Sequence, residues 1–352
     1  MIASPAAPKH LGILLTSRCT ARCGHCIYLC SPDRRETLEE SDLDNLVRDL
    51  DELGFERPSI HLSGGEPFLV FPLLVSAAKT VLDAGYRLDF VETAGGWVKS
   101  SREAAERLLM LRSVGVERLL ISVGPFHQAF IAPQRARRFL RLCEGIFGAG
   151  GLIVNNLDLL EDVERVCADE RVSFEDVVAA LGADYLMRRI SEQVLPLNLG
   201  GRAPETLKPY LPLRPIDELH EECDSRLLQS GSWHLDPSKR IHTGYCGGLT
   251  YPIPDGVAVW FRDFELAQWP ISRILVSKGL PGLIEFARSE VNFEPDPRGY
   301  VSACHACQDA RLALGQLGRF PELGPDGFYS ELRIDKQRRS SIANEPEGSV
   351  KG

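Results

Sequence analysis

The sequence has neither a long apolar run nor an excess of basic residues. No stretch approaches the roughly 18 apolar residues of a membrane-spanning helix, so no membrane span is predicted. The net charge of -9 argues against a nucleic-acid partner, because phosphate binding needs a basic surface. The first ten residues, MIASPAAPKH, lack the apolar segment of a secretory leader and are expected to form a flexible arm. Together these absences predict a cytoplasmic protein.

Cysteine, in contrast, is abundant, with ten residues in 352. Disulfides are rare in cytosolic proteins, so clusters or metals explain these cysteines better. Cys19, Cys23 and Cys26 follow an apolar run at residues 11–15 with the spacing CxxxCxxC. Soft thiolates suit iron, and three of them on one short loop can hold three irons of a cubane cluster. The fourth iron would then be open to a ligand.

Three alternatives for this loop stay open from the residues alone. A structural zinc site normally needs four ligands, so His25 would have to turn inward beside Cys26. Cys30 could instead complete a four-thiolate electron-transfer cluster. A disulfide framework is the least favoured, because a chain of this length can bury an apolar core without one.

A second motif, Ser63-Gly64-Gly65-Glu66-Pro67, follows a predicted buried strand at residues 59–62. Its two glycines let the backbone approach a ligand closely, although the motif alone would be a turn. After a CxxxCxxC loop it resembles the second motif of the radical S-adenosylmethionine (SAM) superfamily. The resemblance covers about the first 200 residues as a strand and helix pattern. Its specificity lies in residues 19–26 and 63–67.

The resemblance implies that Cys19, Cys23 and Cys26 hold a [4Fe-4S] cluster whose fourth iron is chelated by SAM. An external one-electron reductant of the flavodoxin or ferredoxin type is implied as a partner, because SAM cleavage consumes an electron. The resemblance places His25 against the adenine of SAM. The other implied SAM contacts are Gly64, Gly65, Glu66, Ser122, Asn155 and Arg202.

Two further residues are candidates for acid or base catalysis. Glu92 lies at the end of a predicted strand, and His127 follows the next strand in the sequence GPFHQAF. For any one polar residue at a strand end, a loop or capping role is an equally good interpretation.

Strands alternating with helices predict parallel pairing with right-handed crossovers. The predicted strands are residues 11–15, 59–62, 88–93, 118–123, 152–156 and 194–198. The predicted helices are residues 36–54, 71–85, 101–114, 133–148 and 157–181. The predicted fold class is α/β, a partial (β/α)6 TIM-type barrel with its site at the C-terminal ends of the strands.

A proline-rich stretch at residues 204–215 marks a predicted domain boundary. Beyond it we expect a small second domain that contains a β-hairpin and a helix. The expected parts are an arm at 1–10, the barrel at 11–203, a linker at 204–220, the second domain at 221–320 and a frayed polar tail at 321–352.

Four more cysteines fall in the expected second domain. Cys223 and Cys246 bracket the predicted hairpin, and Cys304 and Cys307 form a CxxC pair. Four thiols suffice for a closed iron–sulfur cluster or a zinc site, and the residues alone leave both open. Behind a radical SAM barrel, this order resembles the twitch domain, a shortened SPASM domain. The resemblance implies an auxiliary [4Fe-4S] cluster that transfers electrons.

The sequence therefore predicts a radical SAM oxidoreductase. In this hypothesis a 5′-deoxyadenosyl radical takes a substrate hydrogen, and the auxiliary cluster accepts the remaining electron. The short segment before residue 11 leaves no room for a peptide-leader recognition domain. This mildly favours dehydrogenation of a small sugar or cyclitol in natural-product biosynthesis. Peptide maturation by crosslinking or epimerisation is the alternative, and a non-catalytic iron–sulfur or zinc protein is the rival of another class.

Overall fold

The strands form one eight-stranded sheet in the order β5-β4-β3-β2-β1-β6-β7-β8. The computed structural model describes residues 4–193, 197–220 and 223–343. Pairing is parallel from β5 through β1 to β6 and antiparallel in the last two strand pairs. The strands are β1 (His10–Leu14), β2 (Ser59–Ser63), β3 (Leu88–Thr93), β4 (Leu119–Ser122), β5 (Leu152–Asn155), β6 (Ser232–Asp236), β7 (Arg240–Thr243) and β8 (Tyr251–Pro252). The predicted α/β class with a parallel sheet is confirmed.

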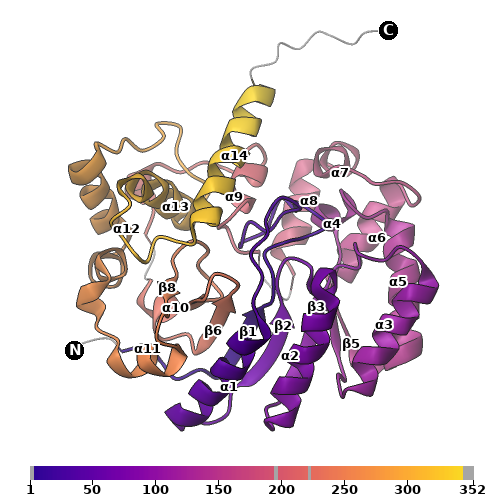
Figure 1. The fold of residues 1–352 in the computed structure, drawn as a ribbon. Helices are drawn as coiled ribbons and strands as arrows, with labels where there is room; N and C mark the ends of the chain where they lie inside the picture. The colour runs from indigo at the N-terminus through magenta and orange to yellow at the C-terminus, as the bar shows by residue number, and fades with distance from the viewer. Residues whose placement is uncertain (1–3, 194–196, 221–222, 344–352) are drawn as a thin grey trace.

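Helices connect the parallel strands, as the sequence pattern predicted (Figure 1). They are α1 (Glu40–Leu53), α2 (Phe71–Asp83), α3 (Ser101–Ser113), α5 (Pro133–Phe147) and α6 (Leu157–Val166), with a short α4 (Pro125–Gln128) that was not predicted. In α1 the buried residues Leu43, Leu46 and Leu50 recur at three- and four-residue steps. This spacing places them on one face against the core, where each leucine stabilises the fold by about 1.5–3 kcal/mol.

The single helix expected over residues 157–181 is wrong beyond Val166. The chain leaves α6 at Cys167, which has extended backbone angles, and a new helix α7 (Phe174–Leu181) follows its N-cap residue Ser173. The side chain of Ser173 accepts a hydrogen bond from the backbone N–H of Asp176, which is the usual N-cap interaction. Gly182, with a φ of 88°, then separates α7 from α8 (Ala183–Ser191). The N-cap at Ser173 and the positive φ of Gly182 therefore divide this segment into separate helices, although its apolar pattern is continuous.

The predicted hairpin is confirmed as β6 and β7, and it joins the same sheet as the barrel strands. Residues His10 to Ile13 of β1 pair in parallel register with Ser232 to Leu235 of β6. The predicted sixth strand at residues 194–198 lies for the most part outside the described residues. The two described positions, Leu197 and Asn198, are not in a strand. The strand beside β1 thus comes from beyond the proline-rich stretch.

The C-terminal part is helical and ends in a long helix, α14 (Asp326–Ala343). The expectation of a frayed tail is wrong as far as Ala343, because Phe328, Tyr329 and Leu332 on this helix are buried. In Figure 1 α14 rises between the helices that follow β1–β5 and those of the C-terminal part. The remaining helices are α9 (Ala203–Leu207), α10 (Asp224–Leu227), α11 (Val257–Asp263), α12 (Pro270–Val291) and α13 (Ala303–Leu314).

Short 3-10 turns complete the described elements. They are η1 (Pro67–Val70), η2 (Ala149–Gly151), η3 (Ile216–Glu218), η4 (Leu266–Gln268) and η5 (Gly315–Leu317). Within the described ranges, every helix is too short or too polar to cross a membrane.

Candidate functional site

A cavity opens at the carboxyl ends of the parallel strands, where sites of β/α barrels normally lie. It holds about 1260 Å³ of space between protein atoms, part of it open to solvent. Most of the residues predicted for SAM binding, for the first cluster and for acid or base catalysis line it together. They are Cys19, Cys23, His25, Cys26, Gly64, Gly65, Glu92, Ser122, His127 and Asn155. Two predicted residues, Glu66 and Arg202, are not in its lining.

The three cysteines of the first loop face the same space as free thiols. Burial raises the pKa of Cys19 to about 12, and burial and the neighbouring thiols raise that of Cys23. The pKa of Cys26 is instead lowered to about 6, first by a hydrogen bond from Cys30. Clustered buried thiolates repel one another, and a soft cation would remove that repulsion. The donor set therefore fits an iron–sulfur cluster on three thiolates.

The two sequence motifs are joined by backbone hydrogen bonds. The N–H of Gly65 donates to the carbonyl of Thr16 (2.7 Å), and that of Glu66 donates to the carbonyl of Arg18 (2.9 Å). A Cβ on Gly65 would lie 2.2 Å from the Arg18 oxygen, and one on Gly64 would lie 2.6 Å from the Thr16 oxygen. Both positions therefore require glycine for this close approach. The loop after β2 therefore fixes the start of the loop after β1 that contains Cys19, Cys23 and Cys26, which we call the thiol loop.

Glu66 is buried next to the cavity, where its hydrogen-bond partner Thr93 is one of the lining residues. Both of its carboxylate oxygens accept a hydrogen bond from the Thr93 hydroxyl (2.9 Å each), and one also accepts from the N–H of Phe68. Burial raises the pKa of Glu66 to about 8. In this structure the side chain ties the end of β2 to the end of β3. Its contact with the amino group of SAM stays a prediction.

Glu92 and His127, the predicted acid or base residues, both lie on the cavity wall. The hydroxyl of Ser122 donates to Glu92 at 3.2 Å, and burial raises the pKa of this carboxyl group. His127 Nδ1 lies 3.2 Å from the Val123 carbonyl, and burial lowers its pKa to about 4. Both groups therefore favour their neutral forms more than they would in water.

His25 packs between aromatic rings at the same wall. Its ring centroid lies 4.7 Å from that of Phe126 and 4.8 Å from that of His127. Its Nδ1 is buried without a hydrogen-bond partner among the described residues. The possible ligand atoms of Cys23, His25 and His127 lie within 4.8 Å of one another. This grouping is also compatible with the zinc alternative for the loop.

Arg202, predicted to contact SAM, lies beneath the thiol loop. Its guanidinium donates to the carbonyls of Leu29 (3.1 Å) and Cys30 (2.9 Å). It also forms ion pairs with Glu331 (3.3 Å) and Asp335 (2.5 Å) of α14. Arg202 is 4% exposed, so it holds the loop from inside the protein. Its positive charge also contributes to the lowered pKa of Cys26.

The same two carboxylates of α14 reach other parts of the thiol loop. Arg22 forms ion pairs with both Glu331 and Asp335, and the hydroxyl of Ser31 donates to Glu331 at 3.3 Å. Glu331 and Asp335 are four residues apart and so share one helix face. That spacing was the available signal in the sequence. It was missed because this segment was expected to be a tail.

Replacing Arg202 with methionine is expected to lower the free energy of unfolding by about 3 kcal/mol, because it breaks a buried ion pair. Urea unfolding of the metal-free protein would measure this change in the free energy of unfolding. Without a bound cluster, the change reports only the ion pairs and hydrogen bonds of Arg202. Arg262→Met is the matched control, because its ion pair with Glu52 is more than half exposed on both sides. Exposed pairs contribute about 0–1 kcal/mol. Equal losses in the two variants would contradict the role of Arg202.

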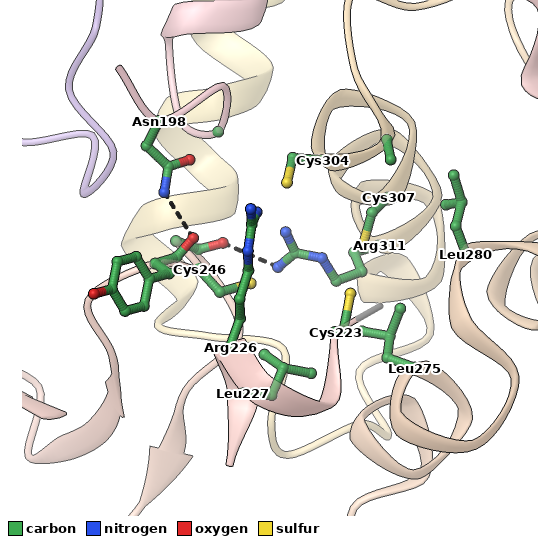
Figure 2. Close-up of a pocket in the computed structure, with 14 residues that line it drawn as sticks. Asn198, Cys223, Arg226, Leu227, Cys246, Leu275, Leu280, Cys304, Cys307 and Arg311 are labelled. Atoms are coloured by element: carbon green, nitrogen blue, oxygen red, sulfur yellow. Dashed lines mark hydrogen bonds between the residues drawn. The ribbon is translucent and has the colours of Figure 1, made fainter. Parts of the chain in front are cut away.

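The four cysteines of the second set line a separate cavity in the C-terminal part (Figure 2). Cys223 directly precedes α10, and Cys246 follows β7. Cys304 and Cys307 lie near the start of α13, which Ser302 caps by accepting from the N–H of His305. Segments far apart in the sequence thus bring four cysteine thiols to one space, a donor set that fits a closed cluster or zinc.

Sequence reasoning missed several residues of the two cavities. Tyr28 also lines the first cavity, while Arg226 and Arg311 line the second. Asn198 lines both, and its side-chain N–H donates to the carbonyl of Tyr245 at 2.8 Å. It therefore marks where the two cavities approach each other.

Comparison with known sequences gives one distant relative, and no family model matches the chain. YydG of Bacillus subtilis (strain 168), a protein named for peptide biosynthesis, is 26% identical over 132 residues. The match covers 38% of this chain and 41% of YydG. The chain thus matches less than half the length of this curated relative.

Solved structures with a similar arrangement are also distant. Native anSMEcpe with bound AdoMet is 11% identical, with 96% of this chain and 100% of that chain covered and a TM-score of 0.42. SuiB of Streptococcus suis bound to S-adenosylmethionine is 13% identical, with 85% and 77% covered and a TM-score of 0.38. BtrN in complex with AdoMet and 2-DOIA is 12% identical, with 67% and 73% covered and a TM-score of 0.38.

Proposed function

We propose that this chain is a radical SAM enzyme that oxidises a peptide substrate. The observation that carries the proposal is the junction of the two motifs. Cys19, Cys23 and Cys26 share one buried wall, and the Gly64-Gly65 loop is hydrogen-bonded to the start of their loop. A [4Fe-4S] cluster on these thiolates would supply the electron that cleaves SAM into methionine and a 5′-deoxyadenosyl radical, which takes a hydrogen atom from the substrate.

The chain would bind and orient SAM with residues already gathered at the cavity. The backbone of Gly64 and Gly65, which lines the cavity, would face its methionine part. His25, held by Phe126, offers a flat ring for the adenine. Ser122 and Asn155 supply polar groups at the ends of β4 and β5 for the ribose or carboxylate. Fixed positions of this kind promote reaction because they remove the entropy cost of alignment.

Glu92 is proposed as the base that takes a proton from the oxidised substrate. Loss of a hydrogen atom leaves a substrate radical, and its oxidation to a double bond releases one electron and one proton. Glu92 lies on the cavity wall, and burial raises its pKa, which makes its carboxylate a stronger base than one in water. His127, on the same wall, is the alternative base.

The released electron would go to an auxiliary [4Fe-4S] cluster on Cys223, Cys246, Cys304 and Cys307. Four thiolates would occupy every iron of such a cluster, which suits electron transfer rather than substrate binding. Asn198, which lines both cavities, supports a short path between them. An external one-electron reductant would deliver the electron that SAM cleavage consumes.

A peptide is the favoured substrate because the sequence relative YydG is named for peptide biosynthesis. The solvent-open part of the first cavity would admit a chain segment while its polar wall holds SAM. Dehydrogenation of a small sugar or cyclitol is the other outcome that an experiment should distinguish.

Anaerobic reconstitution followed by metal analysis and a SAM cleavage assay tests the proposal. We expect about eight irons per chain, as two cubane clusters require, and release of 5′-deoxyadenosine on addition of SAM and a reductant. A deuterated test peptide should transfer deuterium to 5′-deoxyadenosine, whereas a deuterated cyclitol should not. Zinc without iron would support the non-catalytic alternative and overturn the proposal.

A further inference from the structure

Two arginines stand one helical turn beyond two of the cysteines in the second cavity. Arg226 follows Cys223 by three residues, and the backbone N–H of Arg226 donates to the backbone carbonyl of Cys223 at 3.1 Å. Arg311 follows Cys307 by four residues on α13. Residues three or four apart share a helix face, so each arginine lies on the same side of the chain as its cysteine. Figure 2 shows both side chains extending into the space among the four cysteines.

Arg311 is buried, and it forms no ion pair with a carboxylate in the part of the chain that the structure describes. It is 3% exposed, and its Nη1 donates to the Gly247 carbonyl (3.0 Å) and the Tyr329 hydroxyl (3.2 Å), both neutral groups. Its Nε is buried and has no hydrogen-bond partner in the described ranges of the chain. A buried cation needs a partner of opposite charge, since leaving it alone costs several kcal/mol. The groups that can supply that charge here are thiolates.

The electrostatics of the cavity link Arg311 to the same thiols. Burial alone would lower the pKa of Arg311, but Tyr329, Cys246 and Cys307 raise it. Arg311 and Arg226 in turn act to lower the pKa of Cys246, because they stabilise its thiolate. Burial has the larger effect, so the pKa of Cys246 is raised overall. Both cations therefore act on the side of the cavity where Cys246 lies.

We propose that Arg226 and Arg311 raise the reduction potential of the auxiliary cluster and so make it an electron acceptor for the substrate. The inference rests on the proposed function, because it concerns the second cluster assigned there. Reduction adds one negative charge to a cluster that already carries a net negative charge with its four thiolates. Nearby positive charge and N–H groups that donate to sulfur both stabilise the reduced form. Arginine is suited to this role because it stays protonated at every physiological pH.

The potential can be measured on the second cluster alone. In a Cys19→Ala/Cys23→Ala/Cys26→Ala background the first site is removed, and a spectroelectrochemical titration followed by EPR reports the remaining cluster. Adding Arg226→Gln is expected to shift the reduction equilibrium at least tenfold toward the oxidised form, which is 59 mV for one electron. Arg226 is exposed, so this substitution leaves folding intact. Arg226→Lys keeps the charge and should retain most of the potential.

Arg311→Lys tests the buried partner with its charge preserved. It should produce a smaller downward shift than Arg226→Gln, because lysine loses the planar donors but not the charge. Arg262→Gln, an exposed arginine on α11, is the control and should leave the potential unchanged.

The outcomes separate this inference from the function on which it rests. About four irons in the background variant, with the same potential in Arg226→Gln and Arg262→Gln, would overturn the role of the arginines and leave the auxiliary cluster standing. Zinc in place of iron in that variant would overturn both.

Discussion

Cys23→Ala is expected to abolish release of 5′-deoxyadenosine and to lower the iron content from about eight to about four atoms per chain. Cys23 is the central thiol of the loop, is 8% exposed and is influenced by the charges of both Cys19 and Cys26. Two thiolates cannot hold the three irons that leave one iron open for SAM. The measurement is anaerobic iron analysis combined with chromatography of the SAM cleavage products.

Cys30→Ala is the matched control for this prediction. Cys30 lies on the same loop, is buried and also faces the first cavity, where it hydrogen-bonds to Cys26. If it is a spare thiol, its alanine variant should keep the iron and most of the SAM cleavage. A loss equal to that of Cys23→Ala would show that Cys30 closes the cluster, and the radical mechanism would then lack its open iron.

The sequence was sufficient to predict how most of the first cavity assembles. Residues such as Cys26, Gly65, Glu92 and Ser122 each follow or end a strand with a clear apolar pattern. Because the carboxyl ends of parallel strands meet at one edge of a sheet, local strand assignment was enough to bring these residues together. Their gathering at one cavity therefore follows from periodicity and chain order alone.

Side-chain direction was harder to predict than position. Glu66 was expected to contact SAM, but in this structure both of its carboxylate oxygens accept from the Thr93 hydroxyl. Arg202 was also expected to contact SAM, but its guanidinium forms ion pairs with two carboxylates of α14. In both cases a partner distant in sequence decides the direction. Local pattern contains no information about such a partner.

The neighbour of β1 in the sheet was unpredictable for a related reason. The sequence pattern placed the sixth strand before the proline-rich stretch, whereas β6 lies after it and pairs with β1. The run Trp233 to Leu235 was recognised as a strand, yet its partner was assigned only within the hairpin. A strand has two edges, and the period of its side chains identifies neither neighbour.

Cys304→Ala is expected to leave SAM cleavage intact while it stops net turnover of the substrate. Cys304 lines the second cavity and is absent from the lining of the first, so the thiols of the first loop keep their surroundings. Without the auxiliary cluster the substrate radical would have no internal acceptor for its second electron. The assay therefore compares 5′-deoxyadenosine with oxidised product, and their ratio should rise by at least tenfold.

Cys167→Ala provides the control for cysteine loss in general. Cys167 is a partly buried free thiol at the end of α6 and lies in neither cavity lining. It should keep both the iron content and the product ratio of the unmodified chain. If Cys304→Ala also kept that ratio, the second set of thiols would not be the electron acceptor. The four cysteines of the second cavity would then be better explained as ligands of a structural zinc ion, which stabilises the fold without taking part in the reaction.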